Sequence, residues 1–476
     1  MSDYFQPLLV GICAIYLFMI AVTYVIDRGM NRDVFSVLKL CAYFSLIEAL
    51  VMLWFAVRVD RLHSLVLSEV TAKYVQEEYI VGAYLLSVLT FIAVTIGAAI
   101  GAIPRHLVLL NIERKLVRTG AIVRHGSKFK ALCIFGVGVA VHVWMIQGSG
   151  GYDLVWSNLN NIEVVTEGFG WHKAVYSFLI PMGMCLAYPY LYRDRQYLLL
   201  AGVLLSGLFC LGALTQRAPV GIALFVILLT HHYAVRPLSG LLNMRVLCFA
   251  IFSVIFMFVA VQWRHGNIRL ENGTLVLEPK LDEFEENVVQ RLGVTERQVT
   301  AIGYMDTNPY WGFGIYQSLI GAHKRRALNP EKPPVDTGVY IKRISEGGVI
   351  TPPLPANDMP ESSWPDRYLA GYLSFGIGGL IVVAVLSGVL FGLTYRLLIA
   401  RNGNPAAVYL YGVLGFLGAT PLSPLGIVKV GMAVVPTAII GWLYSFSLRG
   451  LGKSRHQHRL PAGSTTIDNH GECPST

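Results

Sequence analysis

The segment Tyr79–Ile103 reads YIVGAYLLSVLTFIAVTIGAAIGAI, 25 residues without a charged side chain. A helix of about 20 apolar residues is long enough to cross the hydrocarbon core of a bilayer. The next 25 residues, 104–128, contain six Lys or Arg side chains and a single Glu. Loops rich in Lys and Arg stay on the cytoplasmic side of a membrane. The two segments therefore predict a transmembrane helix whose C-terminal end faces the cytoplasm.

The composition of the whole chain agrees with a membrane protein. Of 476 residues, 54% are hydrophobic and 14% are charged, and the mean hydropathy is +0.55. Soluble proteins carry about 25% charged residues, so a soluble enzyme, a nucleic-acid-binding protein and a secreted disulfide scaffold are excluded. We attribute the net charge of +9 to cytoplasmic loops. No two of the seven cysteines have a metal-binding spacing, so we expect neither a disulfide nor a metal site.

The same pattern of long apolar runs recurs along the chain and predicts an all-α polytopic membrane protein with about 11 transmembrane helices. The expected spans are 5–26, 35–57, 79–103, 129–147, 174–192, 197–214, 218–233, 244–263, 368–395, 405–420 and 427–448. The seventh and tenth are short, so they could be tilted, kinked or partly re-entrant.

The basic residues of the short loops then set the orientation. With 104–128 inside, the alternation places the other basic short loops and the C-terminal segment inside and the N-terminus outside. The chain divides into helices 1–8 (residues 1–263), one large outer loop (264–367), helices 9–11 (368–448) and a cytoplasmic tail (449–476), which we expect to be disordered.

Local patterns predict some structure inside the outer loop. Residues 268–278, IRLENGTLVLE, place an Asn-Gly turn between two apolar arms, which is typical of a β-hairpin. Helical spacing predicts a helix over 282–292, and a capping box of Thr295 and Gln298 predicts the start of another. Residues 308–365 are rich in Pro, Gly and Trp, so we expect irregular but ordered structure there. Segments 58–78 and 104–123 are predicted to be amphipathic helices at the membrane surface.

Charged residues within or beside the spans are candidates for function, because charge is costly in the membrane. Glu48 and His142 lie in outward-running spans, where they could pair with each other or bond to neighbouring backbone. Arg217 lies in the short outer turn between spans six and seven, and Arg264 ends span eight. Lys429 is close to the outer end of span eleven and could extend to the lipid headgroups.

Arginines at the outer interface suit a lipid diphosphate, since the guanidinium fork matches phosphate oxygens. The chain has no D-x-D pair, the usual metal clamp for a nucleotide sugar. It also has no Walker loop, no G-x-S-x-G and no H-E-x-x-H motif. A sugar donor on the outer side would have to arrive already activated on a lipid.

Four short motifs, in this order, resemble the Wzy-type oligosaccharide repeat-unit polymerases of bacterial surface polysaccharides. They are LTQRAP (214–219), QWRHG (262–266), HKRRALNPEKPP (323–334) and YLAGYLSFGIGG (368–379). The resemblance also extends to the organisation of most of the chain, with one dominant outer loop between two groups of spans.

The resemblance implies a bacterial inner-membrane enzyme with a GT-C-like fold and a large periplasmic loop. Such an enzyme transfers the growing glycan from undecaprenyl diphosphate to an incoming lipid-linked repeat unit, and undecaprenyl diphosphate leaves. The family also implies a chain-length regulator (a Wzz-type co-polymerase) as partner, contact with membrane lipid and no nucleic acid. The alternatives are an O-antigen ligase, which uses a lipid A–core acceptor, and a lipid-linked oligosaccharide transporter or flippase.

The resemblance to these polymerases also suggests roles for particular residues. The residues expected to bind the substrate diphosphate are Arg217, Arg264, Arg291, Arg325, Arg326 and Lys332. The candidates for the catalytic base are His323, Asp306, Glu361 and Asp366, with Glu48 and His142 next. We expect no cofactor and no metal.

Overall fold

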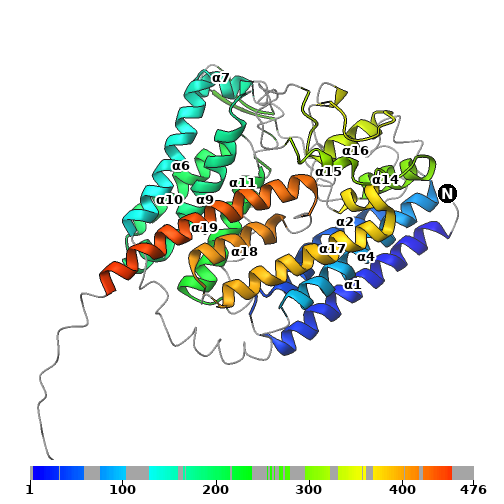
Figure 1. Ribbon diagram of the computed structural model, residues 1–476, viewed down its shortest axis with the longest axis horizontal. Helices are drawn as coiled ribbons and strands as arrows, with labels where there is room; N and C mark the ends of the chain where they lie inside the picture. The colour runs from blue at the N-terminus through cyan, green and yellow to red at the C-terminus, as the bar shows by residue number, and fades with distance from the viewer. Residues whose placement is uncertain are drawn as a thin grey trace, which may run out of the picture.

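The fold is a helical bundle, seen in a computed structural model (Figure 1). The structure describes residues 4–31, 33–57, 76–102, 128–158, 165–166, 168–214, 217–238, 267–271, 274–278, 295–321, 331–355, 358–360, 368–400, 403–417 and 422–452, with isolated positions between 255 and 262. Seven helices in this part of the chain are long and apolar enough to cross a membrane, so the protein is a multi-pass membrane protein.

These seven are α1 (Phe5–Met30), α2 (Val37–Val57), α4 (Glu77–Ala102), α6 (Lys128–Gly148), α9 (Gly170–Arg193), α11 (Arg217–Thr230) with its π-helical end η6 (His231–Val235), and α17 (Leu369–Ala400). Three helices with shorter apolar stretches, α10 (Tyr197–Gly212), α18 (Pro405–Leu417) and α19 (Pro424–Gly452), complete the described bundle. Ten of the eleven expected spans thus coincide with helices, and most of 244–263 lies outside the described residues. Eleven crossings remain a prediction.

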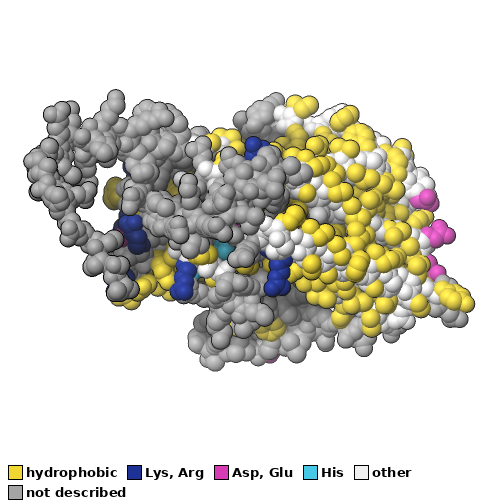
Figure 2. Space-filling view, turned by 90° about the horizontal axis from the view of Figure 1, so that it is seen from below, with side chains coloured by type: hydrophobic (Ala, Val, Ile, Leu, Met, Phe, Trp, Pro, Cys, Tyr) yellow, Lys and Arg dark blue, Asp and Glu magenta, His cyan; other side chains and the backbone are white. Residues whose placement is uncertain are grey.

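The helices form two groups. Helices α1, α2, α4 and α17 pack together, and α6, α9, α10 and α11 form the second group, with α18 between them (Figure 1). Many large apolar side chains on these helices point outward, such as Phe18, Ile96 and Val382. Figure 2 shows a broad hydrophobic face with Lys and Arg on one side and Asp and Glu at the opposite edge. This arrangement suits a lipid-facing surface.

The outer-loop segment contains more regular structure than its composition predicts. The hairpin is confirmed: β1 (Ile268–Glu271) pairs antiparallel with β2 (Thr274–Leu277), and Glu271 lies opposite Thr274. A helix begins at Thr295 as expected and continues to Thr307 (α14). The expectation of irregular structure over 308–365 is wrong at α15 (Gly314–Gln317) and α16 (Thr337–Ser345). Asp336 accepts from the Gly338 N–H and caps α16.

Helix α17 is broken, although its sequence predicts one continuous span. Phe375 and Gly376 leave the helical conformation, and Gly376 has φ +67°, ψ −154°, a region that is open essentially to glycine alone. The break deprives carbonyls of the preceding turn of their helical partners. The N–H groups of Trp311 and Gly312 fill this role, because they donate to Leu373 O at 3.0 Å and Ser374 O at 2.9 Å. The segment after α14 therefore holds the break from outside.

The turns predicted to be cytoplasmic meet at one end of the bundle. Asp33, in the α1–α2 turn, receives four hydrogen bonds there. Its Oδ1 accepts from the Phe35 N–H at 3.0 Å and lies 3.0 Å from His232 Nε2. Its Oδ2 accepts from the hydroxyls of Tyr233 at 2.7 Å and Tyr395 at 2.8 Å. We call this the Asp33 end. It joins α1 and α2 to the last turns of α11 and α17, as the predicted alternation requires.

A buried lysine closes the same turn. Lys39 donates to the carbonyls of Asn31 and Asp33, at 2.6 Å each, and its ammonium lies 3.3 Å from Asp27 Oδ2. Ser36 also donates to Asp27. Lys39 and Asp27 are 3% and 0% exposed. The Lys39 ammonium and the Asp27 carboxylate therefore compensate each other's buried charge, and Lys39 also connects the two ends of the turn.

Asp33→Asn should destabilise the protein by about 2–3 kcal/mol at neutral pH, the range for lost hydrogen bonds to a charged group. Burial alone raises the pKa of Asp33. The hydrogen bond and charge of His232, with the bonds from Tyr233 and Phe35, more than offset it, so the pKa lies below its ordinary value. A carboxyl whose pKa is lower in the folded state stabilises above its unfolded pKa of about 4. That stabilisation is lost as pH falls through the folded pKa.

Thermal unfolding of detergent-purified protein at several pH values tests this expectation. The difference in unfolding temperature between wild type and Asp33→Asn should be largest near pH 7 and should become smaller below about pH 4. Asp194→Asn is the matched control, because the Asp194 side chain is 41% exposed and only 3.9 Å from an exposed Arg193. A gap that is equally large at all pH values contradicts the charge-based account.

Candidate functional site

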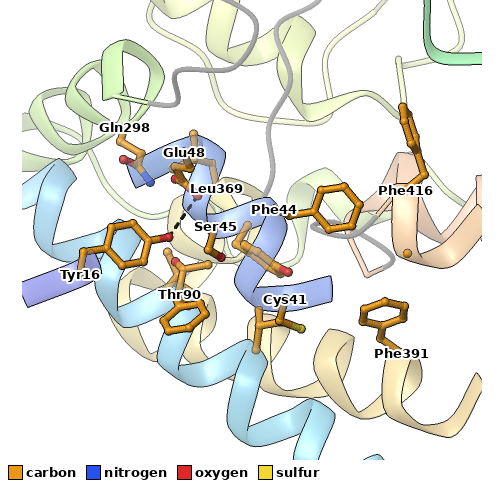
Figure 3. A pocket seen from close by; sticks show the side chains of 15 residues that line it. Tyr16, Cys41, Phe44, Ser45, Glu48, Thr90, Gln298, Leu369, Phe391 and Phe416 are labelled. Carbon is orange, nitrogen blue, oxygen red and sulfur yellow. Dashed lines mark hydrogen bonds between the residues drawn. The ribbon is translucent and has the colours of Figure 1, made fainter. Parts of the chain in front are cut away.

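A cavity of about 180 Å³ lies where α1, α2, α4, α17 and α18 converge beneath α14 (Figure 3). Its polar wall is formed by Tyr16, Ser45, Glu48, Thr90 and Gln298. The remaining wall residues are Cys41, Phe44, Phe91, Val94, Tyr368, Leu369, Leu380, Phe391, Gly415 and Phe416. A largely apolar cavity with a few convergent polar groups is the usual form of a small-molecule site.

Helix α14 runs along α4, from the Glu77 end of that helix to this cavity. Asp306, near its last turn, accepts from the Tyr79 hydroxyl at 2.8 Å. Gln298, near its first turn, lies beside Ser87, with Oε1 3.1 Å from the serine hydroxyl. Ser87 is about 15 Å along α4 from Glu77, at 1.5 Å per residue. The first turn of α14 is therefore held at the depth of the transmembrane helices.

The predicted capping role of Gln298 is wrong, because its side chain faces α4. Its side chain bonds to Ser87 of α4 rather than to the start of its own helix. Arg297 beside it is also buried, at 4% exposure. A polar first turn inside a membrane bundle is costly unless its groups find partners, and the Ser87 hydroxyl is such a partner for Gln298.

Glu48 of α2 is the acidic residue among those that line the cavity, and it is 6% exposed. Its Oε2 accepts from the Tyr16 hydroxyl at 3.4 Å, and its Oε1 lies 3.0 Å from the Ser87 hydroxyl. Figure 3 shows the carboxyl between Tyr16 and Gln298, above Ser45 and Thr90. An acidic residue near the middle of a membrane helix costs about 3 kcal/mol. Three helices thus hold one carboxyl at a cavity.

His142 is not the partner of Glu48, so the predicted pair of these two residues is wrong. His142 of α6 is fully buried in the second helix group, and its Nε2 lies 3.1 Å from the hydroxyl of Tyr152 in α7 (Gly151–Ser157). Its ring also contacts Tyr176 edge-on, with ring centroids 4.8 Å apart. The contacts of His142 are those of a packed core histidine.

Helix α11 brings the Arg217 turn toward the cavity. Gly221 packs so closely on Phe416 that a Cβ would approach its ring to 2.7 Å, and Phe225 contacts Phe44 with ring centroids 5.9 Å apart. Phe416 and Phe44 both line the cavity. Arg217 precedes Gly221 by four residues, which places its Cα on the same face of α11, one turn nearer the outer end.

The structure describes only some of the predicted site residues. Asp306 is exposed, Lys332 is half-buried, and Lys429 is exposed on α19. Only the backbone of Arg217 is described. His323, Glu361, Asp366, Arg264, Arg291, Arg325 and Arg326 lie outside the described residues, as do the predicted helix 282–292 and most of the two predicted surface helices.

Sequence reasoning missed four of the five residues of the polar wall: Tyr16, Ser45, Thr90 and Gln298. Hydroxyl and amide residues are common in membrane helices and surface loops, so nothing in the local pattern distinguishes these four. Within the described part of the chain, no three His, Cys, Asp or Glu side chains gather closely enough to hold a metal ion.

Comparison with known proteins returns no match: no family model, no curated protein and no solved structure is similar to this chain.

Proposed function

We propose that the protein is a polymerase of lipid-linked oligosaccharide repeat units, acting at the outer face of a bacterial inner membrane. The observation that carries the proposal is the convergence on one cavity. The Glu48 carboxyl of α2 and Gln298 of helix α14 line it, and the helix that begins at Arg217 packs on two residues of its wall, Phe44 and Phe416. The resemblance of the four motifs supplies the reaction type.

The proposed reaction transfers the growing glycan from undecaprenyl diphosphate to a hydroxyl of an incoming lipid-linked repeat unit. Arg217 and Arg264 bind the diphosphate, with help from Arg291, Arg325, Arg326 or Lys332. Diphosphate is already a fair leaving group, so stabilisation of its charge does much of the work. A base then needs to take only one hydroxyl proton. A Wzz-type regulator would set the chain length.

Incubation of the purified protein with one synthetic lipid-diphosphate repeat unit should yield a ladder of glycans without added metal or nucleotide. The expectation follows from the absence of a D-x-D pair and from the arginines of the outer turns. The ladder is read on a gel after release from lipid. Complete loss in EDTA, restored by magnesium or manganese, would argue against the proposed mechanism.

Deletion in cells separates polymerase from ligase. Loss of a polymerase should leave lipid acceptors capped with a single repeat unit, because ligation itself is intact. Loss of even that first repeat would identify the protein as the ligase.

A transporter is the second candidate, and the broken α17 favours it, because transporters build sites at discontinuous helices. The same ladder assay discriminates. Detergent-solubilised protein has no second compartment, so a transporter gives no ladder there but should move the lipid-linked oligosaccharide across proteoliposome membranes.

A further inference from the structure

We infer that the cavity binds the acceptor sugar and that Glu48 takes the proton from its attacking hydroxyl. This inference rests on the proposed polymerase function, and it names the acceptor site and the base of that reaction.

The walls of the cavity suit a sugar ring. A pyranose presents hydroxyl groups around its rim and C–H groups on its faces. Thr90, Gln298 and Glu48 can hydrogen-bond to the hydroxyl groups. The rings of Phe91 and Phe391 can pack against the C–H faces. The volume of the cavity is about 180 Å³. The inferred occupant is the single sugar residue that carries the attacking hydroxyl.

Glu48 is positioned as a base would be. Tyr16 of α1 and Ser87 of α4 fix the two carboxyl oxygens from neighbouring helices, so the side chain points into the cavity in one orientation. The Ser87 hydroxyl also links Glu48 to Gln298 of α14. Helix α14 thus contacts the serine that lies beside the proposed base.

The surroundings of Glu48 differ from those of Asp306, a base candidate in the outer loop that the structure also describes. Asp306 is exposed at the outer end of α14 and accepts from Tyr79. Glu48 is buried at the cavity whose walls Phe44 and Phe416 join to the Arg217 helix. A base must reach the attacking hydroxyl beside the diphosphate, so we take the carboxyl at the cavity next to the Arg217 helix rather than the exposed one.

The reaction step balances as follows. The acceptor oxygen forms a bond to the anomeric carbon of the donor glycan, and the bond from that carbon to the diphosphate oxygen breaks. The bonding electrons leave with undecaprenyl diphosphate, whose charge the arginines stabilise. The hydroxyl proton passes to the Glu48 carboxylate and then to solvent, so the enzyme returns to its starting state.

Three variants of purified protein test the inference in the ladder assay: Glu48→Gln, Glu48→Asp and the control Glu346→Gln. Glu346 lies in the outer loop at the end of α16, paired with Lys342 at 3.7 Å and more than a third exposed. The rate of the first addition is measured against pH under single-turnover conditions. Binding of the lipid-diphosphate repeat unit is measured separately.

Glu48→Gln should fold, bind the repeat unit and react about 10²–10⁴-fold more slowly, the usual contribution of a general base. The acid limb of the wild-type pH–rate profile should disappear. Glu48→Asp, which withdraws the carboxyl by one methylene, should lose about tenfold or more while it keeps that limb. Glu346→Gln should match wild type.

If the wild-type enzyme makes a ladder and Glu48→Gln makes it at a similar rate, the role of Glu48 is wrong while the polymerase function stands. A wild-type protein that makes no ladder overturns the polymerase and the inference together. If Glu48→Gln fails to fold, Glu48→Asp decides, because an unchanged rate in that variant excludes a positioned base.

Discussion

Arg217→Lys should slow polymerisation about a hundredfold, nearly as much as Arg217→Ala. The lysine keeps the charge but cannot present the bidentate fork that matches a diphosphate. Loss of one such donor from a water-poor site costs about 3 kcal/mol, which corresponds to about a hundredfold in rate. Arg217 is the first residue of α11. The initial rate of ladder formation by each purified variant measures the effect.

Arg193→Lys is the matched control for this substitution. Arg193 ends α9, its side chain is 59% exposed, and its Nε lies 3.9 Å from Asp194 Oδ1. Its replacement should leave the rate unchanged. A near-normal rate of ladder formation by Arg217→Lys would contradict the assignment of Arg217 to diphosphate binding. It would also contradict the proposed role of the outer turn.

Gly388→Val should prevent the normal packing of α4 against α17 and sharply reduce the yield of folded protein. A Cβ on Gly388 would overlap the Val94 carbonyl, and one on Gly97 would overlap the Val385 carbonyl. The spacing is repeated one turn further by Gly101 and Gly392. Small residues four apart let the backbones of membrane helices approach closely.

Overpacking of such a contact costs about 1–3 kcal/mol, occasionally more. Phe91 of α4 and Phe391 of α17 line the cavity, so any separation of the helices that does not unfold the protein should still lower activity. Size-exclusion profiles and thermal unfolding in detergent measure the first effect. Gly136→Val in α6 is the control, because nothing lies within 4 Å of a Cβ at that position. A Gly388→Val protein as stable as this control would contradict the close packing.

Much of the helical architecture follows from local sequence. The span predicted over 79–103 is helix α4, Glu77–Ala102, and the Asn-Gly turn correctly predicts the pairing of β1 with β2. Both patterns are local: an apolar run of sufficient length has few alternatives to a helix in lipid, and Asn-Gly suits the backbone of a two-residue turn. The alternation of loops also agrees with the meeting of predicted inner turns at the Asp33 end.

The composition of the cavity was decided by tertiary contacts. Ser87 and Gln298 lie 211 positions apart, and their hydrogen bond places α14 beside Glu48. The break in α17 likewise depends on Trp311 and Gly312, which supply the hydrogen bonds that its carbonyls lose. The sequence by itself determined the apolar helices, because burial in lipid depends on composition and length. Only the packed structure decided which polar side chains share a cavity, because that depends on how distant segments satisfy one another's hydrogen bonds.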